Sequence, residues 1–257
     1  MTLTLAERQL AADVGFEVDI CDLIKGTCGG SLNRLIAFTE QFDPKEADGI
    51  AVSVKRDEFT PMLSKLQPQL LPRGYRVFWS GMYGPKGQTL GDAIVALKST
   101  DEYDILRVRQ TNGMNYNVST KDVLERLQKW RSECEFEIVG ADGAWVAIQF
   151  KSLPQSICAF AEEIYEFCPD SVEQGTGLRN ERSEPEAFAA ARRLCPTLSE
   201  KMERKLEAQR ARFESMNIPP EVRARLKSSG FTTTTDMGIR LLAHQLKETW
   251  QLFLWWD

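Results

Sequence analysis

The chain has 257 residues, of which 42% are hydrophobic and 27% are charged, and its formal net charge is −5. A chain of this length can bury roughly 70–75% of the surface that its unfolded form exposes, so it can build a core without a disulfide or a metal. The composition excludes wholesale disorder, and the mild acidity argues against a nucleic-acid partner and favours a basic protein partner.

The N-terminal stretch carries Glu7 and Asp13 among its apolar residues. It lacks the basic start and the continuous apolar run of a secretory signal. A run of about 18 uncharged apolar residues, which a membrane-spanning helix needs, does not occur anywhere in the sequence. We therefore expect a cytoplasmic protein without a membrane partner.

The first part of the chain alternates between helical and extended patterns. An amphipathic helix is predicted over residues 5–14 and a strand over residues 16–21. Apolar residues then recur at helical spacing over residues 32–42, and the overlapping residues 41–49 have the composition of a linker. Clean alternation predicts a strand over residues 50–54.

Further strands and a helix are predicted up to residue 110. Asp57 can cap a helix, and a strand follows over residues 75–79. Residues 80–91 are rich in glycine and too long for a tight hairpin, and they lack the Gly-Lys-Ser/Thr order of a phosphate-binding P-loop. Two β-branched runs, residues 92–98 and 103–110, predict strands on either side of a polar turn.

The next segment begins with a turn over residues 111–117, where asparagine and glycine readily take positive φ. A helix that ends near Trp130 follows. Residues 136–140 and 145–150 look like a hairpin, and Pro154 opens another helix. This order predicts an α+β fold with a mixed or antiparallel sheet and packed helices.

The chain changes character after Gly177, where Arg, Lys and Glu become dense and strand patterns disappear. Thr197 and Glu200 form a capping box that starts a helix with one narrow apolar stripe. Residues 251–257 are apolar again and are predicted to dock as a strand. We expect three parts: an N-terminal segment (1–48), an α+β domain in two pieces (49–178 and 232–257), and a charged helical insertion (179–231).

Six cysteines are scattered without a CxxC pair, and we interpret them as reduced, mostly buried thiols. The single histidine, His244, could pair with Cys168 as a nucleophile and base, but Asp170 argues against a stabilised thiolate. The spacing of the cysteines and the histidine does not suit zinc. We therefore predict no catalytic residue, no metal ligand and no cofactor.

A hard cation is the remaining alternative for metal binding. Carboxylates crowd one predicted helix and its exit, at Glu162, Glu163, Glu166, Asp170 and Glu173. Such a run is more often a solvated helix face.

Several segments carry a resemblance to a known family: GYRVFWS, YDILRVRQTNGMNYNVST, FEIVGADGAWVAIQF, AEEIYEFCPDSVEQGTG and LFLWWD. Together they resemble the bacterial family catalogued as domain of unknown function 4253, from about Gly49 to Gly177 and again from near Thr232. The motif positions of the family fall on Thr111, Asn112, Gly113, Asn115, Tyr116, Phe167, Cys168, Pro169, Asp170, Trp255, Trp256 and Asp257. We expect these residues to lock the fold rather than to form a reactive site.

The resemblance implies an immunity protein, because members of this family occur in loci that look like toxin and immunity clusters, including those of type VI secretion effectors. The expected partner is a cognate effector toxin, with a nuclease as one possible class, and the oligomeric state stays open. Two alternatives remain: an enzyme that uses the FCPD region as a cysteine nucleophile or a carboxylate metal site, and a scaffold that binds through the helical insertion.

Overall fold

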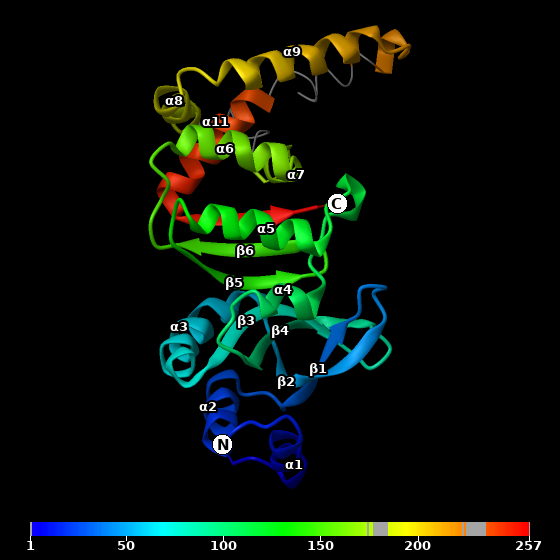
Figure 1. Ribbon diagram of the computed structural model, residues 1–257, viewed down its shortest axis with the longest axis vertical. Helices are drawn as coiled ribbons and strands as arrows, with labels where there is room; N and C mark the ends of the chain where they lie inside the picture. Colours follow the sequence, from blue (N-terminus) through cyan, green and yellow to red (C-terminus); the bar gives the residue numbers. More distant parts are fainter. Residues whose placement is uncertain (1, 174, 177–184, 223, 225–234, 257) are drawn as a thin grey trace. The chain divides into compact units, whose positions relative to one another are not determined.

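The computed structural model describes residues 2–173, 175–176, 185–222, 224 and 235–256 (Figure 1). It has an α+β fold, as predicted. The strands are β1 (Asn33–Phe38), β2 (Pro44–Val54), β3 (Tyr75–Tyr83), β4 (Thr89–Lys98), β5 (Phe136–Asp142), β6 (Trp145–Phe150) and β7 (Gln251–Trp255). Their order in the sheet is β1-β2-β4-β3-β5-β6-β7, and the sheet is mixed because β3 and β5 are parallel whereas β1–β2, β2–β4 and β3–β4 are antiparallel.

The helices precede, separate and follow these strands. They are α1 (Leu5–Asp13), α2 (Val18–Cys28), α3 (Phe59–Leu70), α4 (Asp104–Arg109), α5 (Thr120–Arg131), α6 (Ile157–Phe167), α7 (Asp170–Glu173), α8 (Pro185–Leu194), α9 (Glu200–Ser215) and α11 (Thr235–Thr249). Short 3-10 turns cover Arg56–Glu58, Leu71–Arg73 and Met114–Tyr116. Within the described part of the chain, none of the helices has the length and apolar character needed to cross a membrane.

The chain divides into two compact units. The first comprises Met1–Lys129 and Glu137–Gln149, and the second comprises Trp130–Phe136 and Phe150–Asp257. The division falls inside α5, β5 and β6. The predicted separation into an α+β domain and a charged insertion stays a prediction.

In the first unit, α1, α2 and α3 cover one face of the central strands (Figure 1). Val77 and Trp79 of β3 and Ile94 of β4 belong to the core on this face. The intervening residues Phe78 and Val95 are also fully buried. Strands that are buried on both faces read as continuous apolar runs, which explains the unbroken hydrophobic stretch of β4.

Two elements near the N-terminus have the opposite secondary structure to the one predicted. The predicted strand over residues 16–21 is instead the start of α2, because Ile20 and Ile24, one turn apart, face the core. The predicted helix over residues 32–42 is instead β1, in which Leu35 pairs with Ala47 of β2. Three consecutive residues of β1 are buried, so the strand lacks the alternation that would have identified it.

Two further segments differ from their predictions. The predicted linker over residues 41–49 is largely the first half of β2, whose polar residues are exposed at that end of the strand. The predicted strand over residues 103–110 is α4. In addition, β3 and β4 extend into the glycine-rich segment, so the hairpin turn is shorter than predicted and is closed by a Gly84 N–H to Gln88 carbonyl hydrogen bond of 2.9 Å.

The remaining predicted elements within the described residues are present, including the helix ending near Trp130, the β5–β6 hairpin and the C-terminal strand. The second unit has an aromatic core in which Trp130 contacts Phe160 and Phe167, with ring centroids 5.1 and 5.9 Å apart. A smaller apolar cluster, Phe188, Ala191, Met237 and Leu241, joins α8 to α11.

The prediction that all six cysteines are reduced is wrong for one pair. Cys158 and Cys195 form a disulfide, because folding brings their backbones together across 37 positions of sequence. Cys21, Cys134 and Cys168 are buried free thiols, and Cys28 is a half-buried one.

Candidate functional site

The FCPD motif of the second unit is built into the core. Cys168 is fully buried, and its Sγ lies 3.1 Å from the Trp255 carbonyl and 3.1 Å from the Ser171 hydroxyl. Burial raises the pKa of the Cys168 thiol to about 11, and the negative charge of Asp170 adds to the shift, whereas hydrogen bonds from Ser171 oppose it. The thiol is therefore protonated at neutral pH, and it contacts the carbonyl of Trp255 at the end of β7.

The terminal tryptophans pack onto the same motif. The Trp256 ring meets the Phe167 ring edge-on at 5.5 Å, and Trp256 Nε1 donates to the Phe167 carbonyl at 3.4 Å. The Pro169 carbonyl accepts a hydrogen bond from the Val172 N–H, and this bond lies at the start of α7. Cys168, Phe167 and Trp256 thus make packing or hydrogen-bond contacts with their neighbours, while Asp257 lies outside the described residues.

The candidate catalytic histidine has a different neighbour. His244 lies on α11, where its Nδ1 is 3.8 Å from Glu248 Oε1 one turn further along the helix. Cys168 instead contacts Ser171 and Trp255. The structure thus gives each member of the hypothetical pair its own set of contacts.

Two of the five candidate metal carboxylates, Glu162 and Glu166, make local structural contacts. Glu162 accepts hydrogen bonds from the backbone and the hydroxyl of Ser199, and Glu166 lies 2.8 Å from the Lys201 ammonium. Among the described residues, we find no cluster of three or more His, Cys, Asp or Glu side chains placed to hold a metal ion. The side chain of Glu173 lies outside that description.

The second family motif, in the first unit, forms a closed loop over residues 111–118. Gly113 and Val118 pair across its neck, with N–H to carbonyl distances of 2.8 and 3.0 Å in the two directions. The Asn112 N–H donates to the Gly143 carbonyl at 2.9 Å, and its side-chain oxygen accepts from the Met114 N–H at 3.1 Å. Thr111, Asn112 and Gly113 are all buried. The first half of the motif is therefore an anchor.

The second half of the motif is a tip that faces solvent. Met114 is 64% exposed and Tyr116 is 38% exposed, and Asn115 and Asn117 are exposed as well. Asn117 adopts a left-handed conformation with φ of 56°, which closes the 3-10 turn. Methionine and tyrosine are enriched in protein interfaces, and tyrosine and asparagine recur in antibody paratopes. The composition and exposure of the tip suit contact with another protein.

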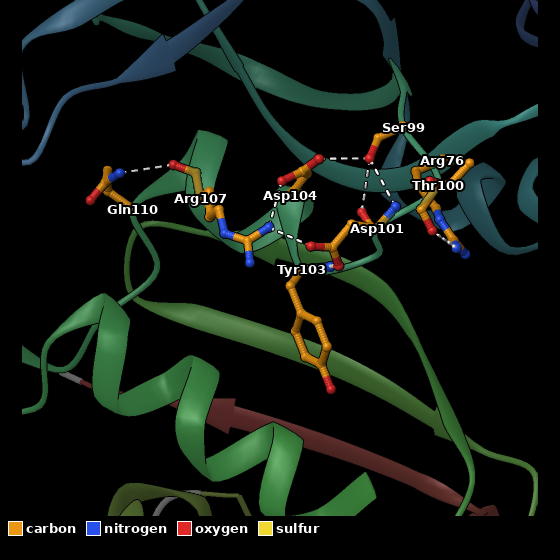
Figure 2. Close-up of polar contacts among 8 residues, drawn as sticks. All are labelled: Arg76, Ser99, Thr100, Asp101, Tyr103, Asp104, Arg107 and Gln110. Atoms are coloured by element: carbon orange, nitrogen blue, oxygen red, sulfur yellow. Dashed lines mark hydrogen bonds and ion pairs between the residues drawn. The ribbon is translucent and has the colours of Figure 1, made fainter.

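A polar cluster orders the chain just before the loop (Figure 2). Ser99 Oγ donates to Asp104 at 2.6 Å, and Arg107 Nη1 lies 2.6 Å from both Asp101 and Asp104. Burial raises the pKa of Asp101, but hydrogen bonds from Arg107 and the Tyr103 N–H outweigh this effect and lower the pKa overall. The Asp101 carboxylate also accepts the Tyr103 N–H at 2.9 Å, so this network holds the chain at the residue that precedes α4.

A buried arginine on α4, just before the loop, bonds to β1 and β3. Arg109, only 1% exposed, donates to the Ile36 carbonyl at 2.8 Å and to the Gly81 carbonyl at 3.0 Å. Its guanidinium carbon lies 5.3 Å from the centre of the Tyr83 ring. Desolvation lowers the pKa of Arg109, and the nearby Asp142 carboxylate opposes that shift.

Asp142 links Gly81 and Tyr83 of β3 to Gly143, which contacts the first half of the loop. It accepts hydrogen bonds from the Tyr83 hydroxyl at 2.8 Å, from the Gly81 N–H at 3.0 Å and from the Gly143 N–H at 2.9 Å. The sequence patterns do not single out Arg109, Tyr83 or Asp142 as site residues. The one available signal was Asp142 in the predicted hairpin turn, and nothing local indicated its partners.

A family model described as Domain of unknown function (DUF4253) matches residues 93–257, well over half of the chain. The chain belongs to this family. The DUF4253 match includes the 111–118 loop, the FCPD motif and β7, and it begins later than the start near Gly49 expected from the resemblance. No curated protein and no solved structure matches the chain.

Proposed function

We propose that this chain is a non-enzymatic immunity protein that binds and neutralises a cognate toxin, and that the 111–118 loop is part of its binding surface. One observation carries the proposal: the DUF4253 motif divides into a buried anchor and an exposed tip. The toxin as partner comes from the resemblance to proteins of toxin and immunity loci.

The anchor makes the tip suitable for binding. Immobilising a side chain or a loop costs free energy when a complex forms, and a loop that is already held loses less. The pairing of Gly113 with Val118 and the contacts of Asn112 with Gly143 supply that constraint. The Met114 and Tyr116 side chains can then be buried against a partner with little ordering of the backbone.

The rest of the surface must supply most of the contact area. A specific interface usually buries about 800 Å² on each partner, which is more than one short loop offers. The net charge of −5 favours a basic partner and would speed encounter with it. The toxin is therefore expected to present a basic surface around its active site.

The geometry favours binding over the enzymatic alternative. Cys168 is a buried thiol whose pKa is raised to about 11 by burial, and Glu162 accepts hydrogen bonds from the backbone and the hydroxyl of Ser199. Cys168 and Glu162, two of the groups that the enzymatic alternative would use for chemistry, therefore have structural contacts.

Co-expression with the effector encoded by the neighbouring gene tests the proposal. The wild-type chain should protect cells and co-purify with the effector, and the Met114→Ala/Tyr116→Ala double variant should bind about tenfold or more weakly. Leu5→Ala is the matched control, because Leu5 is 87% exposed in the same unit but far along the chain from the motif.

Separate outcomes test the immunity function and the role of the 111–118 loop. If wild-type protein neither protects cells nor co-purifies with the effector, the immunity function is wrong. If the double variant binds as tightly as wild type, the loop is not in the interface. Unfolding free energies within about 0.5 kcal/mol of wild type would show that both variants are folded.

A further inference from the structure

A stripe along α6 holds the start of α9. Cys158, Glu162 and Glu166 are spaced four residues apart on α6, so their side chains lie on one face, one turn above another. Each contacts a different residue between α8 and the first turn of α9. The three contacts form a ladder within the second unit.

The three contacts of this ladder are a covalent bond, a pair of hydrogen bonds and an ion pair. Cys158 is bonded covalently to Cys195, the residue that follows α8. Glu162 accepts the Ser199 N–H at 2.7 Å and the Ser199 hydroxyl. Glu166 forms an ion pair of 2.8 Å with Lys201, whose side chain is 77% exposed.

Ser199 connects the middle rung to the helix itself. Its hydroxyl oxygen accepts from the Met202 N–H at 3.2 Å, so Ser199 is the N-cap of α9, in place of the predicted Thr197. Because Glu162 accepts hydrogen bonds from this N-cap residue, α6 is joined to the first turn of α9. Beyond the ladder, the Lys205 ammonium lies 5.3 Å from the centre of the Tyr165 ring.

We propose that Cys158 and Cys195 are a reversible thiol–disulfide modification site that controls how firmly α8 and α9 are held on α6. The disulfide is the covalent rung, and the exposed Lys201–Glu166 ion pair is expected to be weak. Reduction leaves the buried Glu162–Ser199 contact and the packing of the buried Met202 and Leu206 side chains to hold α9. This inference is independent of the proposed function.

The reagents are small thiols and disulfides. A thiolate attacks Sγ of Cys158, which is half-buried, while Cys195 is only 1% exposed. A bond forms between the reagent and Cys158, and Sγ of Cys195 leaves with the electron pair and takes up a proton. A second reagent thiolate attacks the reagent sulfur and releases the Cys158 thiol, so two thiols become one disulfide as the protein disulfide is reduced.

The other cysteines are poorly suited to this exchange. Burial raises the pKa of Cys21, Cys28, Cys134 and Cys168 to about 11 in each case. Thiol–disulfide exchange requires the thiolate, so these four thiols should react slowly in the folded chain. Exchange is therefore directed to the single pair.

The full-length protein is treated with oxidised glutathione or with dithiothreitol, and its thiols are alkylated after denaturation and counted by mass spectrometry. The chain has six cysteines, two of which form the disulfide, so we expect four alkylated thiols after oxidation and six after reduction. Hydrogen exchange is then compared in the two states. Reduction should speed exchange in residues 185–215 about tenfold or more and leave β3 and β4 unchanged.

Two variants complete the test. Cys158→Ala/Cys195→Ala should exchange like the reduced wild type in either reagent, whereas Cys134→Ala should respond to the reagents as wild type does. Six thiols after treatment with oxidised glutathione would overturn the site. Equal exchange of residues 185–215 in oxidised and reduced wild type would overturn its control over α8 and α9, without depending on either variant.

Discussion

The Tyr83 hydroxyl donates to the Asp142 carboxylate at 2.8 Å. This bond ties the end of β3 to the β5–β6 turn, whose Gly143 carbonyl in turn accepts the N–H of Asn112. Burial and the carboxylate both raise the pKa of Tyr83, so the phenol keeps its proton and remains a donor. The anchor of the 111–118 loop is thus linked through Asp142, inside the family match, to Tyr83, which lies outside it.

Removing either partner of this bond should destabilise the first unit. Tyr83→Phe loses one hydrogen bond to a buried carboxylate and should cost about 1.5–3 kcal/mol. Asp142→Asn should cost more, about 3 kcal/mol or above, because it removes the charge facing Arg109 and sets an amide N–H against backbone donors. Urea unfolding measures both, and a Tyr83→Phe variant as stable as wild type would contradict the contact.

Close packing at Gly140 predicts a contrast with Gly143 in the same hairpin. A Cβ at Gly140 would lie 2.3 Å from Nε1 of Trp79, which is stacked between Phe59 and Trp145 at 4.6 and 4.0 Å. Gly140→Ala should therefore cost about 1–3 kcal/mol.

Gly143→Ala is the matched control, because a Cβ there meets nothing within 4 Å. It should change the unfolding free energy by about 0.5 kcal/mol or less. The two variants are compared by their urea midpoints, provided that the dependence of the unfolding free energy on urea concentration is the same for both. Two variants of similar stability would show that Trp79 is free to move.

Acid should weaken the contact between α1 and α2 through Glu7. Desolvation raises the pKa of Glu7, but hydrogen bonds from Lys25, Thr4 and the Leu32 N–H outweigh it and lower the pKa from 4.5 to about 2. A lowered folded-state pKa adds stability above pH 4.5 that is lost as the pH falls toward 2. The shift corresponds to about 3 kcal/mol, since each pKa unit is about 1.4 kcal/mol.

Glu7→Gln isolates that contribution. The variant should be less stable than wild type at pH 7, and the difference should shrink steadily between pH 4.5 and pH 2 as wild-type Glu7 takes up its proton. Urea unfolding at several pH values gives the difference. A constant difference over this range would mean that Glu7 has an ordinary pKa in the folded chain.

Cys168 should resist alkylation in the folded chain. Because the thiol is buried and its pKa is about 11, its reaction with iodoacetamide at pH 7.5 should be about a hundredfold or more slower than in the unfolded chain. Peptide mapping by mass spectrometry follows this site separately from the other cysteines. Rapid native modification of Cys168 would favour the nucleophile hypothesis over a packing role.

Regular periodicity was sufficient to predict several elements. Val123, Leu127 and Trp130 are all fully buried on α5, as their spacing indicates. The α+β class followed from the order of such segments. β1 was mistaken for a helix because Leu35 and Ile36 are both buried, on opposite sides of the strand.

The support of the candidate site could not be predicted, because its contacts are not local. Arg109 bonds to the carbonyls of Ile36 and Gly81, which are 73 and 28 residues away in sequence. A local pattern reports only which residues share a face of one element. The motif residues could be selected by resemblance, but which half is buried required the three-dimensional structure.

The parallel pairing of β3 with β5 has a consequence for folding rate. Ser80 of β3 bonds to Ala141 of β5 at 2.6 Å across 61 residues, whereas β3 and β4 are joined by a short turn. Contacts between residues distant in sequence form late, because closing a long segment costs chain entropy before the contacts contribute any stabilising free energy. We expect the β3–β4 hairpin to form early and β5 to join it in the slow step, so the 111–118 loop acquires its anchor only when folding of its unit is nearly finished.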